Sequence, residues 1–201
     1  MRLITFSGLD GSGKTEQIKL LTEYLKEKRL KYKQIHIIQN SIANKIFPRG
    51  KDSQGSSGSQ SRVLSGIIGI LGRKLALLID IALFRLSLAS MQNIDVVIAD
   101  RYFYDYMVNI YFLEARQNPH VPPFLRHLIP KPDLPVYLKV SPLAADGRKS
   151  DQGIAYLQAK HELFEKLKHR FGLKEIQEMN IADVNREIIE QVEKLLLKKS
   201  K

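Results

Sequence analysis

The segment that most constrains this chain is Gly8–Thr15, which reads GLDGSGKT. It matches the pattern G-x-x-x-x-G-K-[ST], whose backbone amides surround phosphate groups. A short strand-like run, Arg2–Ser7, comes directly before it. The residues Lys14–Lys28 follow, and their apolar side chains recur at helical spacing. The sequence therefore predicts a strand, a glycine-rich phosphate-binding loop and a helix, in that order.

The residue types in this loop suit a nucleoside triphosphate. Gly8 and Gly13 let the backbone approach phosphate oxygens, because no Cβ stands in the way. The N-terminus of the following helix adds N–H donors and a favourable dipole. Lys14 brings a positive charge to the β- and γ-phosphates, and the hydroxyl of Thr15 can bind Mg²⁺. A glycine turn without any nucleotide is the alternative.

Strand-like and helix-like segments alternate along the rest of the chain. Further strands are predicted at Tyr32–Ile38, Asp95–Asp100, Val136–Val140 and Leu173–Met179. Helices are predicted at Val63–Gln92, which can break near Gly72, at Tyr104–Gln117, at Ile154–Arg170 and near Asp183, which can cap the last one. This alternation favours an α/β fold with a parallel sheet. No second domain is recognisable, so residues 1–201 are expected to form one domain.

The composition is that of a globular protein with a basic surface. The formal net charge is +11, but the cations are spread along the chain and no nucleic-acid-binding motif accompanies them. The apolar segment Val63–Phe84 contains Arg73, Lys74 and Asp80, which favours a buried amphipathic helix over a membrane span. No signal peptide is recognisable. We therefore expect a cytoplasmic protein that binds neither nucleic acid nor a membrane.

A polar segment interrupts the alternation of predicted strands and helices at Arg49–Arg62, which reads RGKDSQGSSGSQSR. It is rich in Gly and Ser and has no apolar side chain to anchor it. We expect it to be mobile, either as a lid or as a plain linker.

A second candidate site element is the acid that ends the strand Asp95–Asp100. Next to a phosphate-binding loop, Asp100 can hold Mg²⁺ or its water; a simple strand-end carboxylate is the alternative. Arg101 can bind the phosphates of donor and acceptor with its fork of N–H groups. The alternative role for Arg101 is a salt bridge to Asp105, four residues further along the chain.

Three blocks occur in order along the chain: GLDGSGKT at Gly8, DRY at Asp100–Tyr102 and KPDLPVYLKVSP at Lys131–Pro142. With these blocks the chain resembles the thymidylate kinase family of nucleoside monophosphate kinases. The resemblance implies a five-stranded parallel sheet in the order 2-3-1-4-5, ATP as donor, Mg²⁺ as cofactor and a homodimer formed through helices. The residues then expected to bind ATP are Gly8, Leu9, Asp10, Gly11, Ser12, Gly13, Lys14, Thr15 and Lys149.

The resemblance also suggests where the acceptor binds. It puts Asp10 near the acceptor's sugar, and Phe47-Pro48-Arg49 is similar to a family segment whose arginine binds the acceptor phosphate. Phe84-Arg85 is similar to the family's base-stacking aromatic and its neighbouring arginine, with core packing as the alternative for Phe84. The residues expected at the acceptor are Asp10, Arg49, Phe84, Arg85, Arg101, Tyr102 and Asp105.

The chain departs from the family pattern after DRY, where it continues FYDYMVNIY. Asp105 stands where the family carries serines, and Asn109-Ile110 stands near the usual Tyr-Gln pair. We therefore expect dTMP to be used less well than in a standard member of the family. The lid, about residues 146–153, is short. Arg148 and Lys149 are its adjacent basic pair, and family lid arginines stabilise the moving phosphoryl group.

The expected activity is ATP- and Mg²⁺-dependent phosphoryl transfer to a nucleoside monophosphate, with dTMP the first candidate. The predicted catalytic residues are Lys14, Asp100, Arg101 and Arg148, and the predicted metal ligands are Thr15 and Asp100. Two other interpretations stay open: a kinase for a nucleoside, sugar or other metabolite, and a nucleotide-binding regulatory protein with little turnover.

Overall fold

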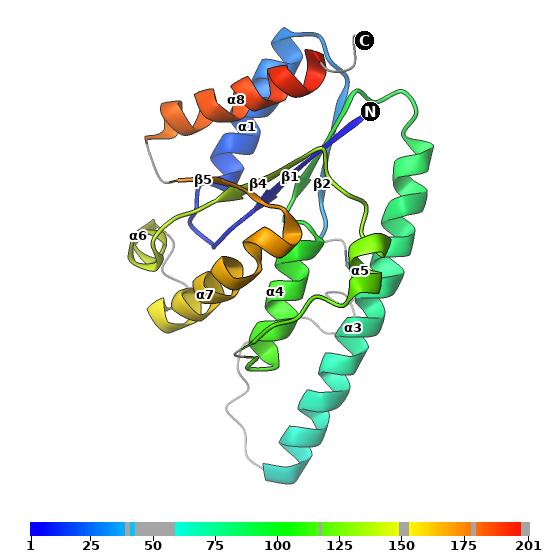
Figure 1. Ribbon diagram of the computed structural model, residues 1–201, viewed down its shortest axis with the longest axis vertical. Coiled ribbons are helices and arrows are strands. Elements are labelled where there is room, and N and C mark those ends of the chain that lie inside the picture. The colour runs from blue at the N-terminus through cyan, green and yellow to red at the C-terminus, as the bar shows by residue number, and fades with distance from the viewer. Residues whose placement is uncertain (39–40, 43–58, 117, 149–152, 178–179, 198–201) are drawn as a thin grey trace.

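The centre of the protein is a parallel five-stranded sheet in the order β2-β3-β1-β4-β5 (Figure 1). The computed structural model describes residues 1–38, 41–42, 59–116, 118–148, 153–177 and 180–197, and in the helix that begins at Ser59 it describes side chains from residue 69 onward. The strands are β1 Arg2–Ser7, β2 Tyr32–His36, β3 Val96–Asp100, β4 Leu134–Leu138 and β5 Lys174–Ile176. The α/β class and the strand order are thus confirmed.

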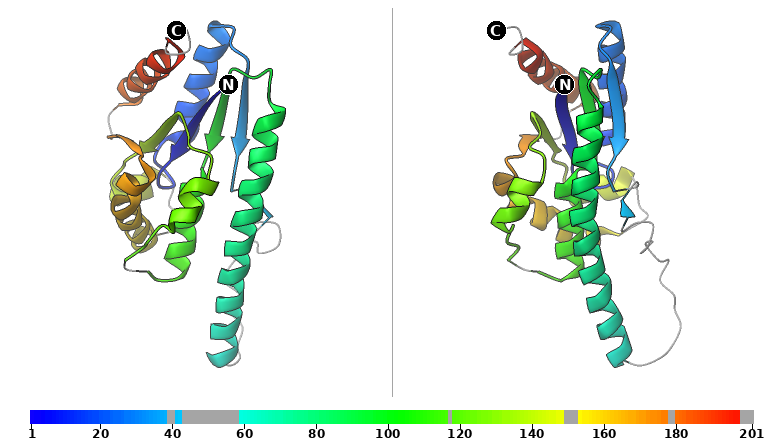
Figure 2. Two further views of the ribbon diagram at one scale, coloured as in Figure 1. Left: turned by 45° about the vertical axis from the view of Figure 1, so that its right-hand side comes forward. Right: turned by 90° about the vertical axis from the view of Figure 1, so that its right-hand side faces the viewer.

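Helices cover both faces of the sheet (Figures 1 and 2). On one face α1 (Lys14–Glu27) packs against α8 (Ile181–Leu197), and on the other α4 (Phe103–Leu113) packs against α3 (Ser59–Ser90) and α7 (Ile154–Phe171). The shorter helices are α5 (Pro123–Leu128) and α6 (Pro142–Arg148).

Alternate strand residues supply the two cores, because successive side chains of a strand point to opposite faces. Ile4 and Ile98 lie in the core under α1 and α8, whereas Leu3 and Val97 lie in the core under α3, α4 and α7. All four are nearly or fully buried. A mostly apolar strand is what a sheet covered on both faces requires.

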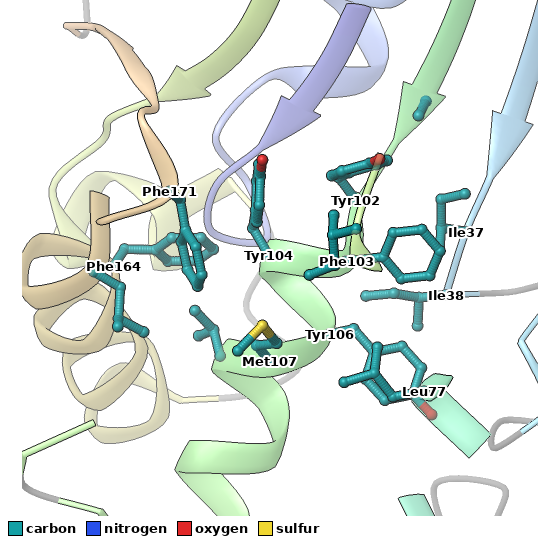
Figure 3. Packing of buried hydrophobic residues seen from close by; sticks show 14 of the residues in the cluster. Ile37, Ile38, Leu77, Tyr102, Phe103, Tyr104, Tyr106, Met107, Phe164 and Phe171 are labelled. Carbon is teal, nitrogen blue, oxygen red and sulfur yellow. The ribbon is translucent and has the colours of Figure 1, made fainter. Parts of the chain in front are cut away.

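Aromatic side chains dominate the second core (Figure 3). Phe84 of α3 packs edge to face on Phe103 of α4, with ring centroids 5.5 Å apart. Tyr104 of α4 stacks on Phe171 at the end of α7, with centroids 4.5 Å apart. These pairs fix α4 between α3 and α7, and α4 begins three residues after the end of β3.

Helix α3 differs from its prediction in two ways. It runs without a break through Gly72, and it already includes residues 59–62, which were expected to be mobile. The cost of one glycine in a helix, about 1 kcal/mol, is small against the burial of Ala76, Leu77 and Ile81 in the next two turns. The rest of the predicted mobile segment, residues 49–58, lies outside the described residues.

The other face of α3 is apolar and exposed to solvent. Its exposed side chains are Leu71, Leu75, Leu78, Ile79, Leu83 and Leu86. None of the helices in the described ranges has the length and apolar content to traverse a bilayer.

The last helix has a different cap from the one predicted. Asn180 Oδ1 accepts the N–H of Asp183 at 2.9 Å, while the Asn180 carbonyl accepts the N–H of Val184 at 3.2 Å. Asn180 is therefore the N-cap of α8. Asp183 lies in the first turn, where its negative charge suits the helix dipole.

We expect Asn180→Ala to lower the free energy of unfolding by about 1 kcal/mol, because a free N–H is left at the start of α8. Asn180→Ser keeps an acceptor oxygen and is expected to retain most of that stability. Urea unfolding of the two variants and the parent measures both. Equal losses in the two variants would contradict the capping role.

Candidate active site

The loop Gly8–Thr15 joins the carboxyl end of β1 to the amino end of α1. The amide of Ser12 donates to the Leu9 carbonyl at 3.2 Å, which closes a turn inside the loop. Thr15, in the first turn of α1, is exposed. In open parallel sheets, ligands bind at the carboxyl ends of the strands. The loop therefore lies where a ligand site is expected in this fold.

Two glycines let the loop pack closely against other backbone. Gly8 has φ +143°, and a Cβ there would lie 2.7 Å from the Leu138 carbonyl oxygen. Gly11 has φ +83°, and a Cβ there would lie 2.4 Å from the Ala145 carbonyl oxygen. Any other residue at these positions would push the loop away from β4 or from α6.

The side chain of Lys14 lies inside the loop and is 6% exposed. Its Nζ donates to the Gly8 carbonyl at 3.0 Å, to the Leu9 carbonyl at 2.5 Å and to Ser12 Oγ at 3.0 Å. Burial, reinforced by the charge of Arg101, lowers the pKa of Lys14 to about 7. The ammonium is thus held at the centre of the loop, and the nearby carboxylates of Asp10, Asp100 and Asp105 offset only part of the cost of its burial.

Asp100 ends β3, the strand next to β1, and His36 ends β2, which lies one strand further out. They are partners in the register of β2 and β3, and His36 Nε2 lies 4.0 Å from Asp100 Oδ2. Asp100 Oδ1 is buried and accepts no hydrogen bond within the described residues. An unpaired carboxylate oxygen there suits the predicted contact with Mg²⁺ or its water.

Arg101 links the loop to helix α4. Its guanidinium pairs with Asp10 in the loop, and Nη1 lies 3.7 Å from Asp105 Oδ1. The backbone of Arg101 has φ +55°, an uncommon conformation for a residue with a Cβ, and its amide donates to the Phe6 carbonyl at 3.0 Å. Strained backbone of this kind often occurs at functional sites.

Asp105, in the first turn of α4, lies against the start of the loop and is 2% exposed. Its Oδ1 accepts the Gly8 N–H at 3.3 Å, and its Oδ2 accepts the Tyr102 N–H at 3.2 Å. Burial raises the pKa of Asp105, while Arg101 acts in the opposite direction. The structure therefore favours the salt-bridge interpretation of Asp105 over contact with an acceptor.

Helix α6 brings Arg148 to the loop from the side of β4. Arg148 is the last residue of α6, it is exposed, and its Nη1 lies 3.5 Å from the Gly11 carbonyl oxygen. A pocket of about 220 Å³ opens beside it. Its walls include Ser12, Gly13, Gln17, Leu138, Val140, Arg148, Ile176 and Gln177. The predicted partner of Arg148 in the lid, Lys149, lies outside the described residues.

Three residues predicted to contact the acceptor have structural contacts instead. Phe84 is 6% exposed in the aromatic core, and Tyr102 is fully buried with its hydroxyl donating to the Pro130 carbonyl at 2.5 Å. Arg85 donates to the carbonyls of His127 and Leu128 at 2.7 and 2.6 Å. Their positions do not support the acceptor role. Arg49 lies outside the described residues, so its role stays a prediction.

His36 is the residue of this site that the sequence analysis missed. A single histidine at the end of a strand carries no motif of its own. The available signal was its place at the end of β2, which becomes informative once β2 is known to pair with β3. Burial lowers the pKa of His36, and the charge of Asp100 acts against that shift.

In comparisons with known proteins, no family model and no curated protein matches the sequence. The fold and the geometry of the loop therefore carry the functional argument.

The low pKa of Lys14 gives a testable dependence of stability on pH. This pKa is about 7 in the folded protein, against 10.5 for a lysine side chain in water. Between these values the unfolded chain binds more protons, so the Lys14 contribution to stability rises with pH, by up to about 1.4 kcal/mol per pH unit. We expect Lys14→Met to be more stable than the parent at pH 7, with the difference shrinking toward pH 9.

Urea unfolding at pH 7, 8 and 9 measures this difference. Lys19→Met, on the exposed side of the same helix, is the matched control and is expected to give a difference independent of pH. A constant difference for Lys14→Met as well would mean that Lys14 stays charged throughout this range.

Proposed function

We propose that this protein is an ATP- and Mg²⁺-dependent kinase that transfers the γ-phosphoryl group to a small acceptor, with a nucleoside monophosphate as the leading class. The observation that carries the proposal is the loop Gly8–Thr15. It lies at the carboxyl edge of a 2-3-1-4-5 sheet, with Lys14 buried in it and Asp100 at the end of the neighbouring strand. Together these features match the needs of triphosphate binding and transfer.

The residues around the loop would have separate roles in binding and transferring the phosphoryl group. Lys14 would leave the loop carbonyls for the β- and γ-phosphates, whose charge favours its protonated form. Arg148, at the mouth of the loop, would stabilise charge on the equatorial oxygens of the moving group. Thr15 and Asp100 would hold Mg²⁺, which neutralises phosphate charge when bound. Within the described residues no group of three or more His, Asp or Glu side chains is placed to hold a metal ion, so phosphates and water would supply the other ligands.

The nucleoside part of ATP has a candidate place in the pocket beside Arg148. That pocket runs from the start of α1 to the ends of β4 and β5 and has apolar walls at Leu138, Val140 and Ile176. Apolar walls next to a phosphate-binding loop suit a base and a sugar.

The first acceptor class of this proposal is a nucleoside monophosphate. Asp105, which stands where the family carries serines, is buried and bonds to the N–H of Gly8, so it gives less reason to expect poor use of dTMP. dTMP therefore stays the first candidate. Acceptor phosphates arrive without a proton on the attacking oxygen, whereas a nucleoside or sugar hydroxyl would need a base. The pair His36 and Asp100, at the ends of β2 and β3, would be a candidate for that base.

The family resemblance also suggests a homodimer, and the exposed apolar face of α3 is the surface on which we would expect it. A nucleotide-binding regulatory protein is the alternative in which the loop binds nucleotide without transfer.

The proposal is tested by ADP formation from Mg·ATP over a panel of nucleoside monophosphates, nucleosides and sugars. We expect acceptor-dependent turnover that Lys14→Ala abolishes and that Asp100→Asn lowers by about two orders of magnitude or more. Lys19→Ala is the control for loss of one lysine from α1 and is expected to keep full activity. Nucleotide binding without turnover on any acceptor would favour the regulatory interpretation.

Arg148 is expected to act in the transition state more than in ground-state binding, because charge spreads over the equatorial oxygens during transfer. Arg148→Ala should then lower kcat by about 10²-fold or more while the Kd for ATP changes little. Single-turnover kinetics and calorimetry separate the two quantities. A weaker Kd with unchanged kcat would make Arg148 a binding residue only.

A further inference from the structure

A second pocket, of about 480 Å³, lies between α5 and the carboxyl end of α7. Figure 1 shows these two helices on the two sides of α4. Five of its lining residues are basic or can become so: Arg126, His127, Lys131, His169 and Arg170. No acidic residue is among the lining residues. The pocket is therefore a concave surface of one charge sign, which attracts anions.

Three cations of this pocket have no carboxylate partner in the part of the chain that the structure describes. Neither Arg126, Lys131 nor Arg170 forms an ion pair there. Arg170 is held instead by the Pro119 carbonyl, at 3.3 Å from Nη1, and by His120 Nδ1, at 3.4 Å. A positive group that has no carboxylate partner keeps its charge available for a ligand.

The inner wall of the pocket is aromatic and rigid. Tyr104 and Phe171 both line it, are 7% and 8% exposed, and stack on each other with an angle of 20° between their planes. Figure 3 shows this pair at the junction of α4 and α7. An apolar wall beneath a cationic rim suits a ligand that has a compact charged end and a less polar body.

This pocket is distinct from the phosphate-binding loop. Lys131 precedes β4 by three residues, and Gly172 precedes β5 by two, so both lie toward the amino edge of the parallel sheet. The loop Gly8–Thr15 follows the carboxyl end of β1. A strand of five residues spans roughly 16 Å, which separates these two residues from the loop, whereas the wall residue Tyr104 lies in the first turn of α4, after the carboxyl end of β3. The two pockets share no lining residue.

We propose that this pocket is a second anion site that binds a small molecule carrying two or more phosphate groups. Arg126 and Lys131 hold the phosphates at the rim, Arg170 adds a fixed charge, and the wall of Tyr104 and Phe171 contacts any apolar part of the ligand. The volume fits a ligand of nucleotide size. This site is independent of phosphoryl transfer at the loop.

The test is calorimetric titration with inorganic tripolyphosphate, and in parallel with ADP, at low salt. Both ligands can also bind the loop, so each titration is done on the parent and on Lys14→Ala. We expect Lys14→Ala to keep one binding event, which the further changes Arg126→Gln and Lys131→Gln weaken about tenfold or more. Binding of tripolyphosphate but not of ADP would identify a polyphosphate site. Tighter binding of ADP than of tripolyphosphate would identify a nucleotide site. Either result supports the proposal.

The matched control replaces two exposed lysines away from the pocket, Lys19→Gln and Lys33→Gln, in the same background. It removes the same charge and is expected to leave the Kd within about twofold, because distant exposed charges are screened. Imidazole resonances of His127 and His169 should shift on binding, while those of His161 should not.

Three results would overturn the proposal. Loss of all binding in Lys14→Ala would assign the ligand to the loop alone. Equal weakening in the pocket variant and its control would reduce the effect to net charge. Shifts at His161 as large as those at His127 would remove the ligand from this pocket.

Discussion

A buried carboxylate, Asp105, joins the loop Gly8–Thr15 to the rest of the fold. It accepts the N–H of Gly8 at the start of the loop and the N–H of Tyr102 at the start of α4, and it lies 3.7 Å from the guanidinium of Arg101. Arg101 in turn holds Asp10 in the loop. A buried charge is tolerated only when it is hydrogen-bonded and paired, so these contacts depend on one another. The loop is thus fixed by contacts with Asp105 and Arg101, and the rest of its surface is left for a ligand.

The same arrangement explains the electrostatics of the site. Lys14 is buried among carbonyl groups and close to Arg101, and its lowered pKa reflects the cost of burying one cation near another. Asp10, Asp100 and Asp105 lie around them and offset part of this cost. A phosphate group would offset more of it, because it brings negative charge directly to Lys14. The structure therefore holds its positive charge at a cost that anion binding would relieve.

The sequence predicted the elements whose signal is local. The loop Gly8–Thr15, the strand at Arg2–Ser7 and the helix after it follow from spacing alone. The order of the strands did not follow from spacing; it came from the resemblance and is confirmed by the sheet. The unbroken α3 at Gly72 and the cap at Asn180 were missed because tertiary burial and side-chain geometry decide them.

The candidate site was harder to predict, because residues next to a motif in sequence need not face the ligand. Tyr102 adjoins Arg101, yet its ring points into the core and its hydroxyl bonds to Pro130. Phe84 has an aromatic ring of the kind that stacks on a base, but Tyr102 and Phe103 pack against that ring.

His36 shows the reverse case. It lies far from every motif in sequence and reaches Asp100 only because β2 pairs with β3. A motif therefore identifies the chemistry of the loop itself, which is made of consecutive residues. The surrounding wall is assembled from distant segments, so strand order and helix packing decide which side chains face it. That difference explains why the structure supports the proposed phosphoryl donor better than the proposed acceptor.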